Sequence, residues 1–257
     1  MFREILTIYR RDLSRMLHSN VVATLIVLFL IMMGAMFFVD FFDNVQALSM
    51  RKFFSQAPLL LSIFCPALTM SILSEERRTQ TLDLLETMPV RTWHIVLAKF
   101  LVSLSLLCLV LVFTISYPIS LSTLGNLDLG PVIGGYIALL MLGGVYLSLG
   151  ILASSLTRDQ ISSFLVAFFL CFLLTFVHRL SSEASGTTAT ILQNISASQH
   201  FSNIARGVVD IRDILYVLAL QCFALTATIF SLESRRYPKV ILNSKSNQVQ
   251  EKTEADQ

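Results

Sequence analysis

Two adjacent glutamates, Glu75 and Glu76, come nearest in this sequence to a pattern that does chemistry. An intramembrane protease of the paired-glutamate kind uses E-E-x-x-x-R, together with metal-binding or general-base histidines that converge on it from later spans. Here Gln80 stands where the arginine belongs. The four histidines fall near the ends of predicted spans, not deep within them: His18, His94, His178 and His200. We therefore expect no catalytic residue, no metal site and no cofactor in this chain, with the protease kept as a less favoured alternative.

Nucleotide chemistry and nucleic-acid binding are also not expected. The chain carries no phosphate-binding loop of the form G-x-x-x-x-G-K-[ST], so any ATP hydrolysis must come from another subunit. Its formal net charge is +2 and its basic residues form no stripe, so a nucleic-acid partner is not predicted.

The composition points to lipid as the solvent of most of the chain. Apolar residues make up 54% of the 257 residues and charged residues only 14%, whereas a soluble domain carries about 25% charged residues. Six stretches of 18 residues or more lack Asp, Glu, Lys and Arg. About 20 helical residues cross the hydrocarbon of a bilayer, and backbone groups there must be paired within the helix. The sequence thus predicts an all-α membrane protein with six transmembrane helices.

The distribution of basic residues gives the orientation. With the N-terminus inside, 14 of the 19 Lys and Arg residues fall on the cytoplasmic side and 5 on the outer side. We therefore expect both termini to be cytoplasmic.

The predicted elements follow in chain order. Residues 1–19 form an interfacial amphipathic helix, because Ile5, Tyr9, Leu13 and Met16 recur at steps of three and four. Small residues in the fourth span, such as Gly150 and Ser154, predict close helix packing. The predicted six-span domain covers 20–238, and its spans are at 20–42, 53–74, 93–124, 131–156, 160–180 and 212–232. It also contains a coupling helix at 75–89 and a re-entrant extracytoplasmic segment at 190–210. A disordered cytoplasmic tail follows it at 239–257.

The loop between the second and third spans holds the candidate functional residues. It is a short, highly charged segment with an apolar edge at Leu82 and Leu85, and Pro89 ends it. A charged helix fixed between two spans can pass the movement of a cytoplasmic partner to both of them. A solvated loop without such a role remains the alternative. The residues predicted to couple to a partner are Glu75, Glu76, Arg77, Arg78, Thr79, Leu82 and Leu85.

Three stretches resemble the permease subunits of ABC-2-type exporters, in the branch that includes the gliding-motility and nitrous-oxide-reductase-maturation permeases. They are Ser71–Phe100, Gly143–Gln160, and His200–Leu220 followed by Ser231–Arg236. The first is fairly specific, and the other two occur in the matching order. With the six-span plan, the resemblance extends to about Pro238.

The resemblance implies a bacterial inner-membrane permease that works with a separate cytoplasmic ABC ATPase, which would hold ATP and Mg²⁺. A second permease subunit, identical or related, would complete the pathway, and a periplasmic accessory protein is a further partner. The segment at 75–89 would be the family's coupling helix. A second cytoplasmic contact would be made by Thr157, Arg158, Asp159 and Gln160.

Two further alternatives remain open. A secondary transporter usually carries ionisable residues at mid-membrane, and the six predicted spans have none. A membrane anchor or force-transmitting component would have the same architecture but move no substrate. A neighbouring gene for an ATPase with a phosphate-binding loop would favour the exporter.

Overall fold

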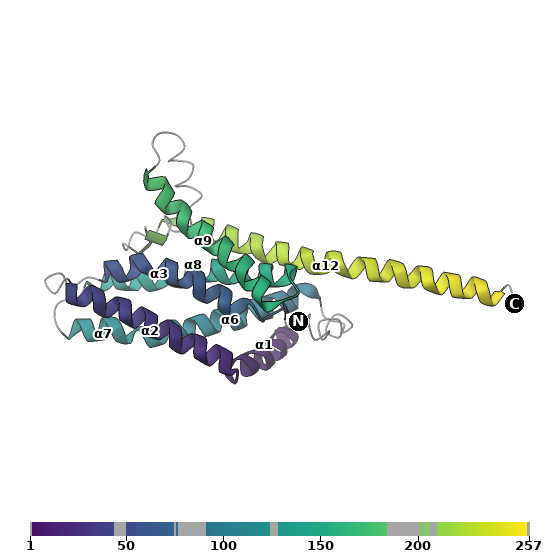
Figure 1. Ribbon diagram of the computed structural model, residues 1–257, viewed down its shortest axis with the longest axis horizontal. Coiled ribbons are helices and arrows are strands. Elements are labelled where there is room, and N and C mark those ends of the chain that lie inside the picture. Colours follow the sequence, from purple (N-terminus) through teal and green to yellow (C-terminus); the bar gives the residue numbers. More distant parts are fainter. Residues whose placement is uncertain are drawn as a thin grey trace.

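The computed structural model describes residues 2–43, 50–74, 76, 91–123, 128–183, 201–202, 204–205 and 210–255. The regular secondary structure in these ranges is entirely helical (Figure 1). The helices are α1 (Phe2–Leu17), α2 (Asn20–Asp43), α3 (Arg51–Thr69), α6 (Thr92–Thr114), α7 (Ser116–Ser122), α8 (Leu129–Leu156), α9 (Gln160–Glu183) and α12 (Ile211–Ala255).

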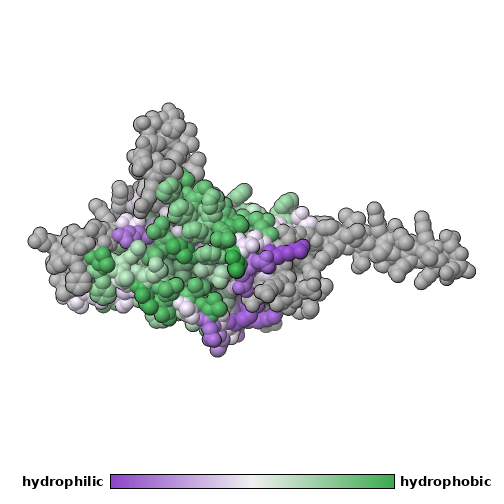
Figure 2. Space-filling model, viewed as in Figure 1, coloured by the Kyte–Doolittle hydropathy of each residue, from purple (hydrophilic) through white to green (hydrophobic). Residues whose placement is uncertain are grey.

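Five helical segments in the described residues are long and apolar enough to cross a bilayer: Asn20–Val39, Thr92–Ser122, Leu129–Leu156, Gln160–Val177 and Ile211–Ser234. The apolar part of α3, Phe53–Thr69, is shorter. Large apolar side chains cover much of the outside of the bundle, as lipid contact requires (Figure 2). The chain is therefore a multi-pass membrane protein, with five spans by length and α3 as a shorter apolar helix beside them.

Helix α3 ends at Thr69, although the apolar pattern predicts a span up to 74. The chain turns at residues 70–73. The residues after the helix end need other acceptors for their N–H groups, and here Ser154 of α8 accepts hydrogen bonds from the N–H groups of Leu73 (3.1 Å) and Ser74 (3.0 Å). This side chain replaces the helical acceptors, so the helix stops earlier than hydropathy alone indicates.

Helix α8 is the centre of the bundle, because 78% of its span is buried against 17% for α12. Its small residues let neighbouring helices approach closely. A Cβ atom at Gly150 would overlap the hydroxyl of Thr69 in α3, one at Gly143 would overlap Leu107 in α6, and one at Gly144 would lie 3.0 Å from Gln221 in α12. The small residues of this span thus pack inside the chain.

The third predicted span, at 93–124, is divided into α6 and α7 at Ile115. Pro118 has no N–H to donate to the carbonyl of Thr114 four residues earlier, so the helix breaks there. The hydroxyl of Tyr136 in α8 donates to that carbonyl at 2.8 Å. A buried carbonyl that the proline leaves without a donor is thereby satisfied by a neighbouring helix.

Helix α1 lies at the end of the bundle beyond which α12 projects (Figure 1). Its buried positions, Ile5, Asp12 and Met16, share one face, which packs against α6. Helix α12 continues through most of the tail predicted at 239–257, as far as Ala255. Extending a formed helix needs no new nucleus, which explains why a polar sequence can continue it. Of the predicted re-entrant segment, Phe201 and Ile204 are described, and both are buried.

The contact between Gly150 and Thr69 gives a test of the packing. Gly150→Ala should lower the stability by about 1–3 kcal/mol, since the added methyl group overlaps Thr69 in a filled core. Thermal unfolding in detergent measures the loss. Gly130→Ala is the matched control, because its Cβ atom would meet only the Asp128 carboxylate at 3.6 Å. Adding Thr69→Ala to Gly150→Ala should recover part of the loss, and equal melting temperatures for all variants would contradict the packing.

Candidate functional site

Among the residues predicted for coupling, Glu76 is described. It lies just beyond the turn that follows α3, with its side chain only 9% exposed. Glu75, Arg77, Arg78, Thr79, Leu82 and Leu85, and with them most of the helix predicted at 75–89, lie outside the described residues. The described part of the site is therefore the root of the coupling segment, which we define as residues 70–74 and 76.

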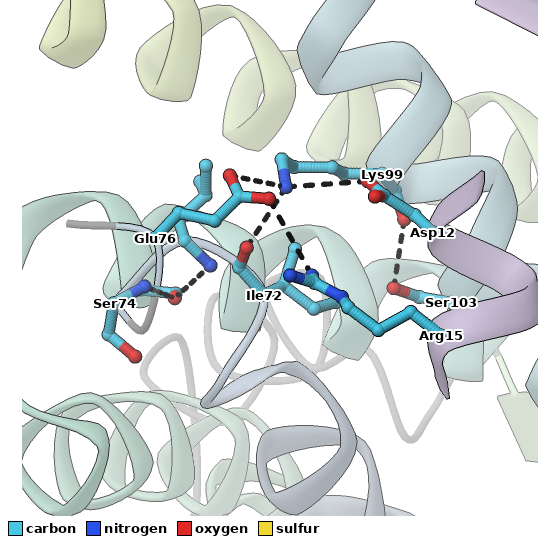
Figure 3. Close-up of polar contacts among 9 residues, drawn as sticks. Asp12, Arg15, Ile72, Ser74, Glu76, Lys99 and Ser103 are labelled. Atoms are coloured by element: carbon cyan, nitrogen blue, oxygen red, sulfur yellow. Dashed lines mark hydrogen bonds and ion pairs between the residues drawn. The ribbon is translucent and has the colours of Figure 1, made fainter. Parts of the chain in front are cut away.

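Lys99 of α6 holds this root from one side (Figure 3). Its amine lies 2.7 Å from Oε2 of Glu76 and donates a hydrogen bond to the carbonyl of Ile72 at 3.0 Å. The Lys99 side chain is 1% exposed. A buried ammonium is stable only with opposite charge and acceptors around it, and this one has both. Lys99 thus joins the start of α6 to the end of α3 and to the residue that begins the charged segment.

Helix α1 adds a second pair of charges to the same place. Oδ2 of Asp12 lies 3.5 Å from the Lys99 amine, and the Arg15 guanidinium lies 3.6 Å from Oε1 of Glu76. Figure 3 shows both side chains reaching from α1 toward the Lys99–Glu76 pair. We call Asp12, Arg15, Glu76 and Lys99 the junction cluster. Two carboxylates and two cations balance one another in it, which limits the cost of removing these charges from water.

Two contacts outside the junction cluster also fix α1 to α6. The hydroxyl of Tyr9 lies 2.9 Å from that of Ser105, and Nδ1 of His94 lies 3.6 Å from Oε2 of Glu4. Both contacts place α1 along α6 over several turns. The interfacial helix is thus attached to the bundle by polar contacts as well as by its apolar face.

Helix α8 holds the root from the other side through Ser154. This hydroxyl accepts from the N–H groups of Leu73 and Ser74, and it donates to the carbonyl of Met70 at 3.3 Å. The side chain of Ser74 also donates to the carbonyl of Met70. With Lys99 on α6 and Arg15 on α1, the root is therefore fixed to three helices by directional contacts.

The second predicted contact lies between α8 and α9. Thr157 closes α8, with its N–H 3.2 Å and its hydroxyl 3.0 Å from the carbonyl of Ala153. Arg158 and Asp159 are exposed, and Gln160 begins α9. Because Ser154 lies one turn before Thr157 and contacts the root, both predicted sites belong to the same end of the bundle.

The geometry gives no support to a protease or metal site. Glu76 is engaged by Lys99 and Arg15, and the described residues contain no group of three His, Cys, Asp or Glu side chains that could hold a metal ion. His18 contacts the carbonyl of Ser14 on the exposed side of α1, and His94 faces Glu4. In the part of the chain that the structure describes, this arrangement holds a chain segment in position.

No role for Lys99 was predicted from the sequence. This residue lies two turns inside α6, fully buried. The position of Asp12 in the sequence could have predicted a buried cation, because Asp12 lies on the same helical face as Ile5 and Met16. A carboxylate on the buried face of an amphipathic helix requires a cation opposite it.

Replacing Lys99 tests the junction cluster. Lys99→Met keeps the length of the side chain but leaves Glu76 buried without its nearest cation, which should cost about 3–5 kcal/mol. Thermal unfolding in detergent should show a large fall in melting temperature. The double variant Lys99→Met with Glu76→Gln should recover much of it, since no buried charge is then left alone.

Arg15→Gln is the matched control within the cluster. The Arg15 side chain is 45% exposed and 3.6 Å from its partner, so its loss should cost less than about 1 kcal/mol. Equal losses for Arg15→Gln and Lys99→Met would contradict a cluster centred on the lysine.

Comparison with known proteins agrees with this architecture. Residues 6–226 match the model of the ABC-2 family transporter protein, a range that includes the described root, α6, α8 and most of α1. No match is found among curated proteins. Since the family match covers most of the chain and the described helices form a multi-pass membrane bundle, this chain is a member of the ABC-2 family of transporter proteins.

Proposed function

We propose that this chain is the permease subunit of an ABC-2-type exporter, coupled to a separate cytoplasmic ATPase. Family membership and the multi-pass bundle support a membrane component of such a transporter. In this proposal α3 is the sixth span. Its apolar part is shorter than those of the other five, and local thinning of the bilayer or flanking polar residues compensate for the difference. The chain belongs to the bacterial inner membrane and has both termini in the cytoplasm, as its basic residues favour.

The observation that carries the proposal is the attachment of the coupling root. The root, residues 70–74 and 76, contacts α6 through Lys99, α8 through Ser154 and α1 through Arg15. A segment that only linked two spans would need no such set of directional contacts. Here a displacement of the residues after Glu76 would be passed directly to three helices.

In the proposed mechanism the ATPase docks on the segment at 75–89, with Glu75, Arg77, Arg78, Thr79, Leu82 and Leu85 at the contact. Residues 157–160 form a second contact at the same end of the bundle. ATP and Mg²⁺ are held by the ATPase, and closure of its two copies biases a dimer of permease subunits between inward-open and outward-open forms. The energy for this shift comes from nucleotide bound outside this chain.

Charge reversal tests the docking site. Arg77→Glu with Arg78→Glu should reduce co-purification of the ATPase by tenfold or more, because like charges across an interface cost several kcal/mol. Membrane insertion should remain normal. The measurement is recovery of the ATPase with tagged permease from detergent extracts, normalised to the amount of permease.

The chain offers a matched control at the other end of α3. Arg51 and Lys52 form a second adjacent basic pair, at the first two positions of that helix. Their reversal to glutamate should leave ATPase recovery unchanged, since the proposed orientation puts them on the extracytoplasmic side. Equal losses from both pairs, or no loss from Arg77 and Arg78, would remove the docking assignment.

Accessibility labelling tests the orientation separately. Thr79→Cys in a chain whose native cysteines are replaced should react with a membrane-impermeant maleimide in inside-out vesicles and resist it in intact cells. The reason is the excess of basic residues on the proposed cytoplasmic side. Labelling from the outside of intact cells would reverse the topology and with it the proposed coupling.

A further inference from the structure

Helix α1 has an apolar strip that the described chain leaves largely uncovered. Leu6 is 55% exposed and Leu17 47% exposed, and Leu13, which is partly buried against the core, lies between them on the same side of the helix. This strip is next to the buried face of Ile5, Asp12 and Met16 that packs on α6. The helix therefore has two apolar sides, of which one is used inside the protein.

The apolar strip continues onto a membrane span. Only His18 and Ser19 separate α1 from α2, and Val21, four residues after Leu17, is 57% exposed. Val27 and Leu28 extend the exposed apolar surface along α2. Since α2 is apolar enough to lie in the bilayer, the leucine strip of α1 lies where the hydrocarbon meets the headgroups.

The acidic and basic side chains of α1 lie on different sides of the helix. Its two carboxylates turn toward α6, where Glu4 faces His94 and Asp12 faces Lys99. Arg10 is exposed, and no carboxylate in the described ranges pairs with it. It follows Leu6 by one turn and precedes Leu13 and Leu17, so it lies at the edge of the leucine strip. Figure 2 shows hydrophilic surface at this end of the bundle, beside the hydrophobic surface of the spans.

We propose that Arg10 and the strip of Leu6, Leu13 and Leu17 form a binding site for an anionic lipid on α1. The leucines enter the acyl boundary and the guanidinium extends from the strip to the lipid phosphate. A zwitterionic lipid would contact the leucines equally well, but a cation in its headgroup already balances its phosphate. An anionic lipid has a net negative charge that can pair with Arg10. This site goes beyond the proposed function and does not depend on it, because it concerns the permease chain and lipid alone.

Neighbouring arginines give a sharp test. The purified full chain is exchanged into nanodiscs of phosphatidylcholine with an equal share of phosphatidylglycerol, and native mass spectrometry counts the lipids that stay bound. The wild-type chain should retain phosphatidylglycerol in preference. Arg10→Gln should reduce that preference about fivefold, as expected for one basic residue near an anionic surface.

Arg11→Gln is the matched control. Residue 11 is exposed and lies about 100° further around the helix, away from the leucine strip, so the preference should change less than twofold. Leu6→Asn should lower retention of both lipids, which separates the apolar strip from the charge. Equal retention of the two lipids by the wild type, or equal preference in Arg10→Gln and wild type, would overturn the proposal.

An acidic surface of a protein partner is the competing occupant of Arg10. In that case Arg10→Gln would lower recovery of the ATPase while leaving the phosphatidylglycerol preference intact, and the lipid site would be wrong. Since Arg10 makes no described contact within the chain, this variant should keep the wild-type melting temperature, so a loss of lipid would not reflect unfolding.

Discussion

The ammonium group of Lys99 is almost completely removed from solvent, and the arrangement at this end of the bundle depends on how its charge is balanced. Glu76 supplies the nearest opposite charge at 2.7 Å, Asp12 a second at 3.5 Å, and the carbonyl of Ile72 a hydrogen-bond acceptor at 3.0 Å. Together with Lys99 itself, these groups come from three separate parts of the chain: α1, the root after α3, and α6. The lysine can be buried only if α1, the end of α3 and the start of α6 meet there, so its charge fixes their relative register.

The helices around this charge are also the most tightly packed. The spans of α8 and α6 are buried over 78% and 61% of their residues, compared with 28% for α2, 22% for α9 and 17% for α12. Gly150 lets α8 approach α3 closely, and one turn later Ser154 binds the coupling root. The root is therefore attached to the most buried part of the bundle. Helices α2, α9 and α12 leave most of their surface for lipid or for another subunit.

Hydropathy could predict most of the helices but not the contacts that organise them. The apolar runs place α2, α8 and α9 within a few residues of their ends, because burial in lipid needs only length and composition. The early end of α3 was not predictable, since it depends on a serine 80 residues away in the sequence. The pairing of Lys99 with Glu76 and Asp12 is likewise a property of helix packing. In the sequence, Lys99 looks like any basic residue beside a span, and only Asp12 on the buried face of α1 indicates that a buried cation must exist.

The distances in the junction cluster suggest where movement would be absorbed. Lys99 holds Glu76 and Ile72 by short contacts, while the pairs that α1 makes, Asp12 with Lys99 and Arg15 with Glu76, are 3.5 and 3.6 Å long. The Arg15–Glu76 pair is partly exposed and contributes little stability, whereas separating Lys99 from Glu76 or from Asp12 would leave charges buried alone. A force on the coupling segment would therefore move α6 together with the root before breaking these buried pairs. The contact between Arg15 and Glu76 would change first, which makes it the adjustable part of the junction.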